Sequence, residues 1–90
     1  MSRVRQRVVV HGDVQGVFFR DTLRRQASDR RVAGWVRNCP DGTVEAVFEG
    51  EPDDVRRMVE LSHEGPRGAS VERVDTFDEE PEGLSEFSIR

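Results

Sequence analysis

The first third of the chain shows a strand-like run followed by a helix-like run. Residues Val4 to His11 are rich in valine and end at Gly12, which predicts a strand that enters a loop. Beyond this loop, Phe19, Leu23 and Ala27 recur at helical spacing with charged residues between them. This spacing predicts a helix of about three turns directly after the loop.

The middle of the chain predicts a β-hairpin and a second helix. Two strand-like runs, Ala33 to Cys39 and Thr43 to Glu49, flank the turn Pro40-Asp41-Gly42, in which proline presets φ and glycine accepts a positive φ. Glu51-Pro52-Asp53-Asp54 begins the helix, because an early proline loses no hydrogen bond and acids complement the helix dipole. Gly65-Pro66 ends it. The residues expected on its inner face are Val55, Met58, Val59 and Ser62, flanked by Leu61.

The last part of the chain predicts two more strands. Val71 to Phe77 forms the first, and an irregular valine spacing within it indicates a bulge. Phe87 and Ile89 alternate in the second, which is short. The acidic stretch from Asp78 to Gly83 between them is expected to be a solvated loop.

This order of elements predicts the α+β class. It is the β-α-β-β-α-β order of the split βαβ, ferredoxin-like sandwich with a short extra C-terminal strand, in which two helices pack on one face of an antiparallel sheet. A chain of 90 residues is too short for two separate cores, so we expect a single domain over residues 1–90.

The composition argues against nucleic acids and membranes as binding partners. The formal net charge is −4 and the basic residues are dispersed among acids, so a surface that follows a nucleic-acid backbone is not expected. The single cysteine, Cys39, and an arginine-rich rather than apolar start predict a cytoplasmic protein that does not bind membranes. We also expect a monomer. All 14 basic side chains are arginine, for which high genomic G+C content and adaptation to a salty cytoplasm remain alternative explanations.

The segment from Gly12 to Arg20 has the features of an anion-binding loop. Two glycines precede a predicted helix, so backbone N–H groups can converge on an anion at the helix N-terminus. The Arg20 guanidinium offers a planar fork of donors that matches two phosphate oxygens. An ordinary turn between a strand and a helix explains the glycines equally well, because such loops are common.

Three segments of the chain carry a resemblance to a known family. They are Val14-Gln15-Gly16-Val17-Phe18-Phe19-Arg20, Gly34-Trp35-Val36-Arg37-Asn38 and Asp41-Gly42-Thr43-Val44-Glu45. Together they resemble the acylphosphatase signature, and the similarity continues through Gly65-Pro66 to the final Phe87-Ser88-Ile89. The chain is therefore identified as similar to acylphosphatases, which hydrolyse the carboxyl-phosphate bond of acyl phosphates.

The resemblance implies a role for each site residue. The loop Gln15, Gly16, Val17, Phe18, Phe19 and Arg20 would cradle the phosphate, Arg20 would complete the cradle, and Asn38 would position the attacking water. It implies a small-molecule acyl phosphate as substrate, inorganic phosphate as product and competitive inhibitor, and no cofactor or metal. Nothing in the sequence forms a distinct pocket for the acyl group.

The implied chemistry needs few catalytic residues. The leaving group is a carboxylate whose conjugate acid has a pKa of roughly 4, so no general acid is required. Binding the phosphoryl group, stabilising its charge and aligning a water remain, which are matters of positioning and electrostatics. The substrate's own phosphate could accept the proton from the water.

Other chemically capable residues have structural explanations. His11 at the end of the first strand could transfer a proton or be phosphorylated, but a structural role is favoured. His63 is expected to be a helix C-terminal cation, and Cys39 to point away from the face that carries Asn38. Trp35 is expected in sheet or core packing, and no ligand spacing indicates a metal.

The sequence departs from the acylphosphatase pattern at two places. Asp13 replaces a commonly basic or neutral residue, and its carboxylate would repel the substrate unless an arginine pairs with it. Arg30-Arg31 replaces the usual Leu-Gly pair after the first helix. Losing glycine there predicts either a left-handed Arg31 or a rebuilt turn, with reduced stability.

Two other functions fit the same fold. A noncatalytic anion-binding module is possible on any fold that hosts many functions, but the presence of both Arg20 and Asn38 argues against it. RNA binding on the sheet would need exposed aromatic residues and a basic surface, which the sequence does not indicate. Similar domains begin large hydrogenase-maturation carbamoyltransferases, whereas this chain is expected to comprise the one domain.

Overall fold

The computed structural model describes residues 2–16 and 18–90. The elements are β1 (Val4–Asp13), α1 (Phe19–Asp29), β2 (Ala33–Asn38), β3 (Val44–Gly50), α2 (Pro52–Glu64), β4 (Ser70–Glu79) and β5 (Phe87–Ile89). Their order and type agree with the sequence prediction, and most boundaries differ by one or two residues. In the described part of the chain, neither helix has the length and apolar character needed to cross a membrane.

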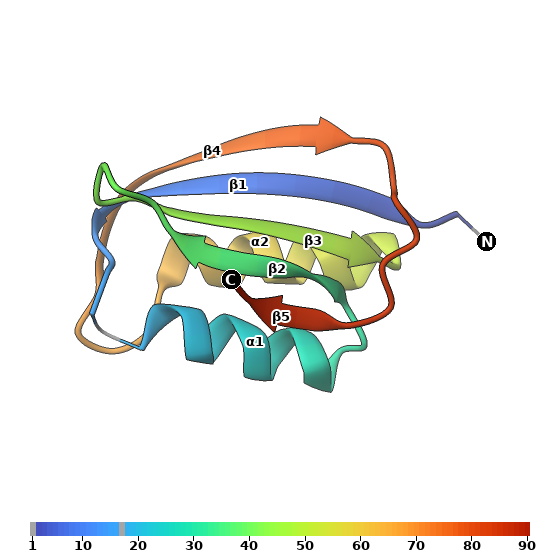
Figure 1. The fold of residues 1–90 in the computed structure, drawn as a ribbon, viewed down its shortest axis with the longest axis horizontal. Coiled ribbons are helices and arrows are strands. Elements are labelled where there is room, and N and C mark those ends of the chain that lie inside the picture. The colour runs from blue at the N-terminus through green and yellow to red at the C-terminus, as the bar shows by residue number, and fades with distance from the viewer. Residues whose placement is uncertain (1, 17) are drawn as a thin grey trace.

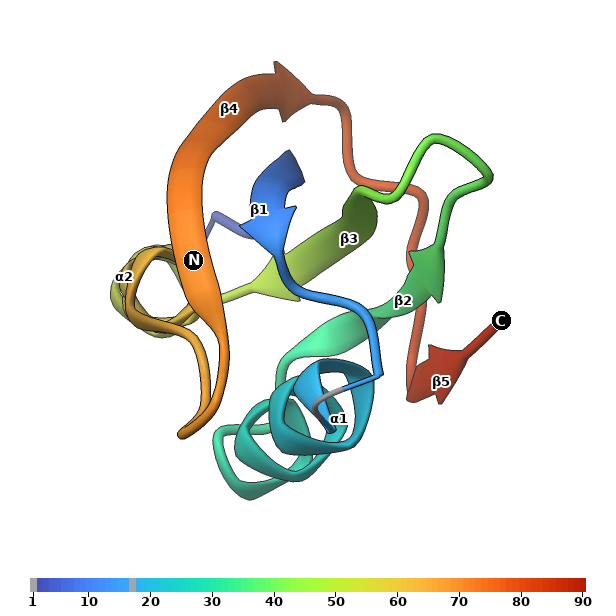
Figure 2. The same ribbon diagram turned by 90° about the vertical axis from the view of Figure 1, so that its left-hand side faces the viewer.

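The five strands form one sheet in the order β4-β1-β3-β2-β5, and both helices pack on the same side of it (Figures 1 and 2). The four longer strands pair antiparallel, as predicted for the ferredoxin-like sandwich. β5, the short extra C-terminal strand, pairs parallel with β2 and makes the whole sheet mixed. The long connection after β4 crosses to the opposite edge of the sheet, which brings β5 beside β2 in this direction.

Alternation along the strands separates a buried face from an open one. Side chains at even positions of β1, β2 and β3 point to the helices, as the period of two requires. They meet the apolar stripe of α1 that the sequence predicted. The core cluster includes Val8, Val10, Val36, Val44, Ala46 and Phe48 from the sheet, and Phe19, Leu23, Ala27, Val55 and Met58 from the helices.

The predicted bulge lies where β4 pairs with the end of β1. His11 pairs with Arg73 and Gly12 with Val71, so Glu72 has no direct partner on β1. One extra residue in a strand shifts the alternation, which explains the irregular valine spacing in the sequence. The shift occurs just before the loop that leads to α1.

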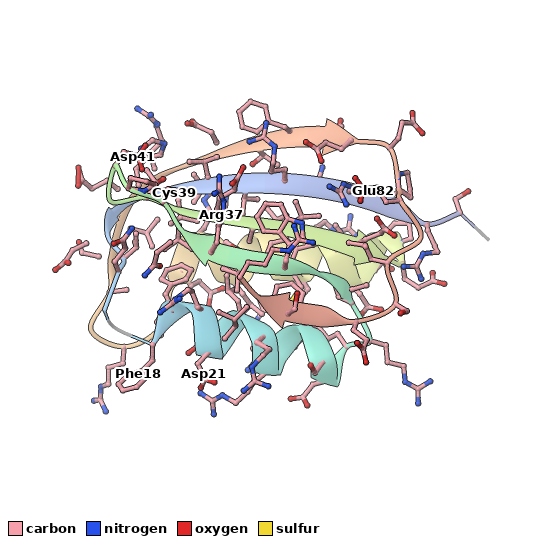
Figure 3. The ribbon with its side chains drawn as sticks, in the orientation of Figure 1. Phe18, Asp21, Arg37, Cys39, Asp41 and Glu82 are labelled. Atoms are coloured by element: carbon pink, nitrogen blue, oxygen red, sulfur yellow. The ribbon has the colours of Figure 1, made fainter. Side chains whose placement is uncertain are left out.

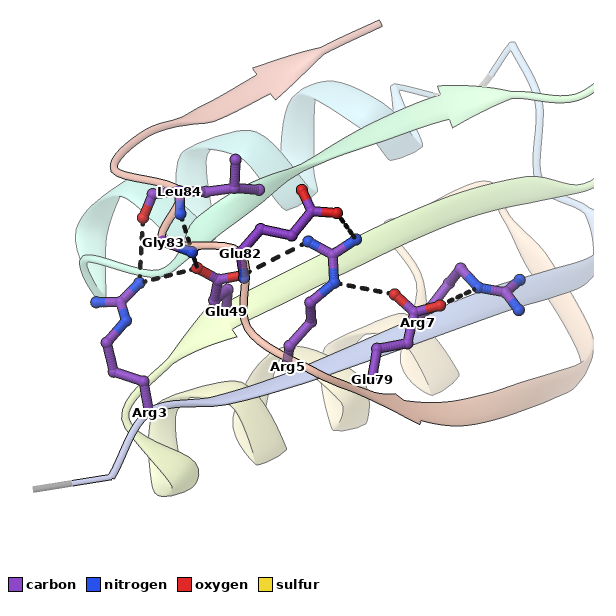
Figure 4. Close-up of polar contacts among 8 residues, drawn as sticks. All are labelled: Arg3, Arg5, Arg7, Glu49, Glu79, Glu82, Gly83 and Leu84. Atoms are coloured by element: carbon purple, nitrogen blue, oxygen red, sulfur yellow. Dashed lines mark hydrogen bonds and ion pairs between the residues drawn. The ribbon is translucent and has the colours of Figure 1, made fainter.

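Glu49 anchors the connection between β4 and β5 (Figure 4). Its carboxylate is fully buried and accepts hydrogen bonds from the backbone N–H groups of Glu82, Gly83 and Leu84 at 2.7–2.9 Å. The Arg5 guanidinium lies 3.5 Å from the same carboxylate. Most of the acidic stretch is exposed, as predicted, but its first two residues belong to β4 and the backbone at its far end is bonded to Glu49.

Charged side chains cover the open face of the sheet. Glu79 lies between two cations on β1, at 2.9 Å from Arg5 and 2.8 Å from Arg7. The Arg90 guanidinium lies 4.8 Å from the centre of the Trp35 ring, which is half-buried on this face. Trp35 thus packs on the sheet, as expected. Ion pairs and a stacked arginine cover the face of the sheet that the helices leave free.

The end of α1 bears out one of the two alternatives for Arg31. The Val32 N–H donates to the carbonyl of Ala27 at 2.8 Å, and the Arg31 N–H donates to that of Ser28 at 3.2 Å. These two bonds define a Schellman motif, in which the residue at the position of Arg31 is left-handed and usually glycine. Arg31 has φ 56°, so an exposed arginine occupies the backbone conformation that favours glycine.

Replacing Arg31 by glycine is expected to raise the melting temperature. The left-handed backbone destabilises the folded state by about 1–2 kcal/mol for a residue with a Cβ, and glycine relieves this strain. Glycine also makes the unfolded chain more flexible, which offsets roughly 0.5–1 kcal/mol of that gain. For a domain of this size the gain corresponds to about 2–6 °C. Thermal unfolding followed by circular dichroism measures it. Arg30→Gly is the matched control, because Arg30 has φ −97° and glycine relieves nothing there, so its melting temperature should fall.

Candidate active site

One cavity of about 290 Å³ opens between the β1–α1 loop, the first turn of α1 and the ends of β2 and β5. Figure 3 labels Phe18 and Asp21, which lie at the same end of the molecule, where α1 begins. The cavity brings together segments that are distant in the sequence. Its lining residues are Val14, Gly16, Phe18, Phe19, Arg20, Asp21, Asn38 and Ile89.

The loop that enters α1 has a backbone conformation that suits an anion site. Gly16 has φ 74° and Phe18 has φ 61°, so the chain turns through two left-handed residues before the helix starts. Left-handed residues in such a loop turn neighbouring N–H groups toward a common concave side, where an anion binds. The N-cap of α1 is Phe18, whose side chain accepts no hydrogen bond, so the amides of the first turn have no side-chain cap.

Arg20 supplies the positive charge of the cavity. It is half-buried in the first turn of α1, and the ion pairs among residues 2–16 and 18–90 leave it without a carboxylate partner. The neighbouring carboxylate of Asp21 pairs instead with Arg24 at 2.9 Å and with Arg25 at 3.1 Å. The helix N-terminus adds a partial positive charge beside Arg20. The cavity is therefore suited to an anion.

Asn38 contributes an acceptor to the same cavity. Asn38 lies two residues after Val36 on β2, so both side chains are on the face of the sheet that the helices cover. There the Asn38 side chain points toward the start of α1. The Oδ1 atom is buried and accepts no hydrogen bond from the part of the chain that the structure describes. Buried polar atoms are nearly always paired, so within the described part of the chain this carbonyl oxygen is available to accept a hydrogen bond.

The Gln15 side chain does not line the cavity. Its Nε2 atom donates to the carbonyl of Cys39 at 2.8 Å and to that of Thr43 at 2.9 Å. These bonds tie the loop to the β2–β3 hairpin, next to the strand end that carries Asn38. The sequence placed Gln15 in the loop but gave no signal for this contact, because it joins positions that are distant along the chain.

The other predicted site residues fall into two groups. Gly16, Phe18, Phe19, Arg20 and Asn38 line one cavity, whereas Val17 lies outside the described residues. The lining also includes Asp21 and Ile89, which the sequence did not single out.

Asp13 and Cys39 do not line this cavity. The carboxylate of Asp13, at the exposed end of β1, makes no ion pair within residues 2–16 and 18–90, so no arginine there offsets its charge. Cys39 is a free, half-buried thiol just beyond the end of β2. Neither residue contributes a side chain to the proposed chemistry.

His11 belongs to a different cavity. Its Nε2 atom lies 3.0 Å from a carboxylate oxygen of Asp75 and 3.2 Å from the Arg73 guanidinium on β4. The hydrogen bond with His11 holds the pKa of the Asp75 carboxyl below its ordinary value. His11 lines a cavity with Asp41, Thr43 and Arg73, apart from the cavity that Arg20 and Asn38 line.

Residues able to bind a metal do not gather near the first cavity. Across residues 2–16 and 18–90, no three histidine, cysteine, aspartate or glutamate side chains are grouped as metal ligands would be.

Comparison with known proteins assigns this architecture to a family. The family model for acylphosphatase matches residues 6–89. The chain belongs to the acylphosphatase family. Acylphosphatases are hydrolases, so the enzyme class, the fold and the family that the sequence predicted are confirmed.

Individual acylphosphatases match almost end to end. The acylphosphatase of Haloarcula marismortui is 51% identical over 90 residues, which cover 100% of this chain and 99% of the relative. That of Thermococcus kodakarensis is 51% identical over 89 residues, covering 99% and 98%. The solved structure of an acylphosphatase from Coxiella burnetii superimposes with a TM-score of 0.93 at 39% identity, covering 98% of this chain and 93% of that one.

Proposed function

We propose that this acylphosphatase hydrolyses acyl phosphates with Arg20 and the loop amides as the phosphate site and Asn38 as the residue that positions the water. The observation that carries the assignment is that the buried Oδ1 of Asn38 and the guanidinium of Arg20 line one cavity, each without a partner among residues 2–16 and 18–90. This pairing of an acceptor with a cation suits the two reactants. The water donates a hydrogen bond to Asn38, and the phosphoryl oxygens accept hydrogen bonds from Arg20.

The reaction is a displacement at phosphorus. The water oxygen forms a bond to phosphorus, the bond from phosphorus to the carboxylate oxygen breaks, and the products are a carboxylate and inorganic phosphate. The negative charge on the phosphoryl oxygens is stabilised by the Arg20 guanidinium and by the amides at the start of α1. Asn38 holds the water in line with the breaking bond, which lowers the entropic part of the barrier.

The proton from the water goes to a phosphate oxygen of the substrate. The only carboxylate among the described lining residues is Asp21, and it is held by Arg24 and Arg25. The leaving carboxylate needs no proton, because its conjugate acid has a pKa of roughly 4. The substrate therefore serves as its own base, and the protein contributes positioning and charge.

The enzyme is proposed to act as a cytoplasmic monomer on small-molecule acyl phosphates, without a metal. Its single cysteine suits a reducing compartment.

Hydrolysis of benzoyl phosphate in the presence of a chelator, with inorganic phosphate as inhibitor, tests the phosphate site. Activity should survive chelation, because Arg20 and amides meet the phosphate charge. Phosphate should compete with the substrate, because both carry the group that the cradle binds. Complete loss on chelation that one particular metal restores would reveal a metal site, and noncompetitive inhibition would place the anion site elsewhere.

A further inference from the structure

The cavity is larger than the phosphate site needs. Its volume is about 290 Å³, close to the lower end of small-molecule sites, which is roughly 300 Å³. A phosphate has five non-hydrogen atoms, and even at the roughly 30 Å³ that a water molecule occupies in the liquid they would fill only about half of it. The acyl carbon of the substrate is two bonds from phosphorus, so the acyl group has to occupy the remaining space or the cavity mouth.

Two apolar side chains that line the cavity, Phe18 and Ile89, are exposed and can contact an acyl group. Phe19 and Val14 also line the cavity, but they are buried in the core. Phe18 is 81% exposed and Ile89 is 40% exposed, and they are two of the three large apolar side chains that the described part of the chain exposes. An exposed phenyl ring on a left-handed residue lacks the packing that usually compensates such a conformation.

β5 gives Ile89 a fixed place in the wall. Ile89 pairs with Val36 of β2, and the next N–H, that of Arg90, donates to the Val36 carbonyl at 2.8 Å. Ile89 is thereby held opposite Val36, two residues before Asn38 on the neighbouring strand β2. Phe18 comes from the β1–α1 loop, so the two apolar side chains belong to different segments and meet at one cavity.

Charge in the cavity selects against a second anionic group. Arg20 is the only cation among the described lining residues, and the phosphate engages it. Asp21 lies in the same wall. The Asp21 carboxylate already holds Arg24 and Arg25, so a carboxylate on the acyl group would find no unpaired cation among the described lining residues, and its desolvation would be uncompensated.

We propose that Phe18 and Ile89 form an acyl subsite that favours acyl phosphates with an uncharged apolar acyl group, aromatic or branched, over small or carboxylate-bearing ones. This inference rests on the proposed phosphate site, because that site fixes where the acyl group begins. It gives the extra C-terminal strand a function: β5 supplies one wall of the subsite.

The test compares three substrates on the same enzyme variants. In the wild-type enzyme, kcat/KM should fall from benzoyl phosphate to acetyl phosphate to succinyl phosphate. Ile89→Ser and Phe18→Asn should each lower the ratio of kcat/KM for benzoyl phosphate to that for acetyl phosphate about three- to tenfold. Asparagine is chosen at position 18 because it tolerates the left-handed backbone. Ile89→Val, which keeps most of the apolar surface, should retain most of the ratio.

The control separates the subsite from general apolar exposure. Phe77 is 42% exposed on the open face of the sheet, away from the cavity, so Phe77→Ser should leave the ratio within twofold of wild type. Ratios within twofold of wild type in both Ile89→Ser and Phe18→Asn would overturn the subsite, as would a wild-type preference for acetyl phosphate. Competitive inhibition by inorganic phosphate is recorded in the same series. If it remains while the ratio does not move, the subsite fails and the phosphate site stands.

Discussion

Replacing Arg20 by alanine is expected to abolish turnover and inhibition by inorganic phosphate together. The guanidinium is the only cation among the described residues of the cavity, so substrate and inhibitor lose the same partner. Removing a charge that stabilises a transferring phosphoryl group costs on the order of a thousandfold or more in turnover. Steady-state hydrolysis of benzoyl phosphate, with phosphate as competitor, measures both quantities.

Arg20→Lys distinguishes charge from geometry. Lysine keeps the positive charge but lacks the planar fork that holds two oxygens, so severe impairment is expected. Arg56→Ala is the control for net charge, because Arg56 lies on the exposed surface of α2 and should leave both quantities near wild type. Phosphate inhibition that persists in Arg20→Ala at the wild-type constant would contradict the assignment.

Replacing Asn38 by alanine is expected to separate binding from chemistry. The substrate phosphate still meets Arg20 and the loop amides, so inhibition by phosphate should stay within a few fold of wild type. Turnover should fall on the order of a hundredfold or more, by analogy with deleting one positioned polar group. Measuring the inhibition constant and kcat on the same preparation tests both halves.

Gln6→Ala serves as the matched control for loss of an amide side chain. Gln6 lies on β1, and its amide bonds to Asp78 at the surface, so its loss should change neither constant. Near-full turnover in Asn38→Ala would refute the water-positioning role. Asp21 would then be the next residue to test, because His11 lies in the other cavity against Asp75.

The local pattern of the sequence was sufficient for most of the fold. Helical spacing predicted α1 and α2, alternation predicted the strands, and one irregular valine spacing predicted the bulge at Glu72. The missing glycine after α1 predicted the left-handed Arg31 as one of two outcomes. Each of these signals lies within a few residues of the feature that it predicts.

Features that depend on distant partners were not predictable in this way. The direction of β5 is set by the connection that Glu49 holds, and Glu49 in the sequence is an ordinary polar residue of an alternating strand. The Gln15 contact with the hairpin and the place of Ile89 in the cavity wall also depend on pairing between remote segments. The roles of Arg20 and Asn38 came from resemblance to a family, not from the pattern.

Glu49 makes one wall of the site sensitive to acid. Burial alone would raise the pKa of its carboxyl, but the donors from Glu82, Gly83, Leu84 and Arg5 outweigh burial and hold that pKa below its ordinary value. A lowered pKa in the folded state stabilises the fold above the ordinary pKa of glutamate, and this stabilisation is lost as the pH falls through the lowered value.

The segment that Glu49 anchors leads to β5 and carries Ile89. β5 is only three residues long, so this segment is held by the Glu49 carboxylate, by its short pairing with β2 and by the contact of Phe87 with Phe48. Loss of the carboxylate removes one of these three anchors. Segments with few anchoring contacts open locally at a lower free energy than the core. In acid, therefore, the strand that forms the acyl wall is expected to detach while the loop around Arg20, which does not depend on Glu49, keeps its shape.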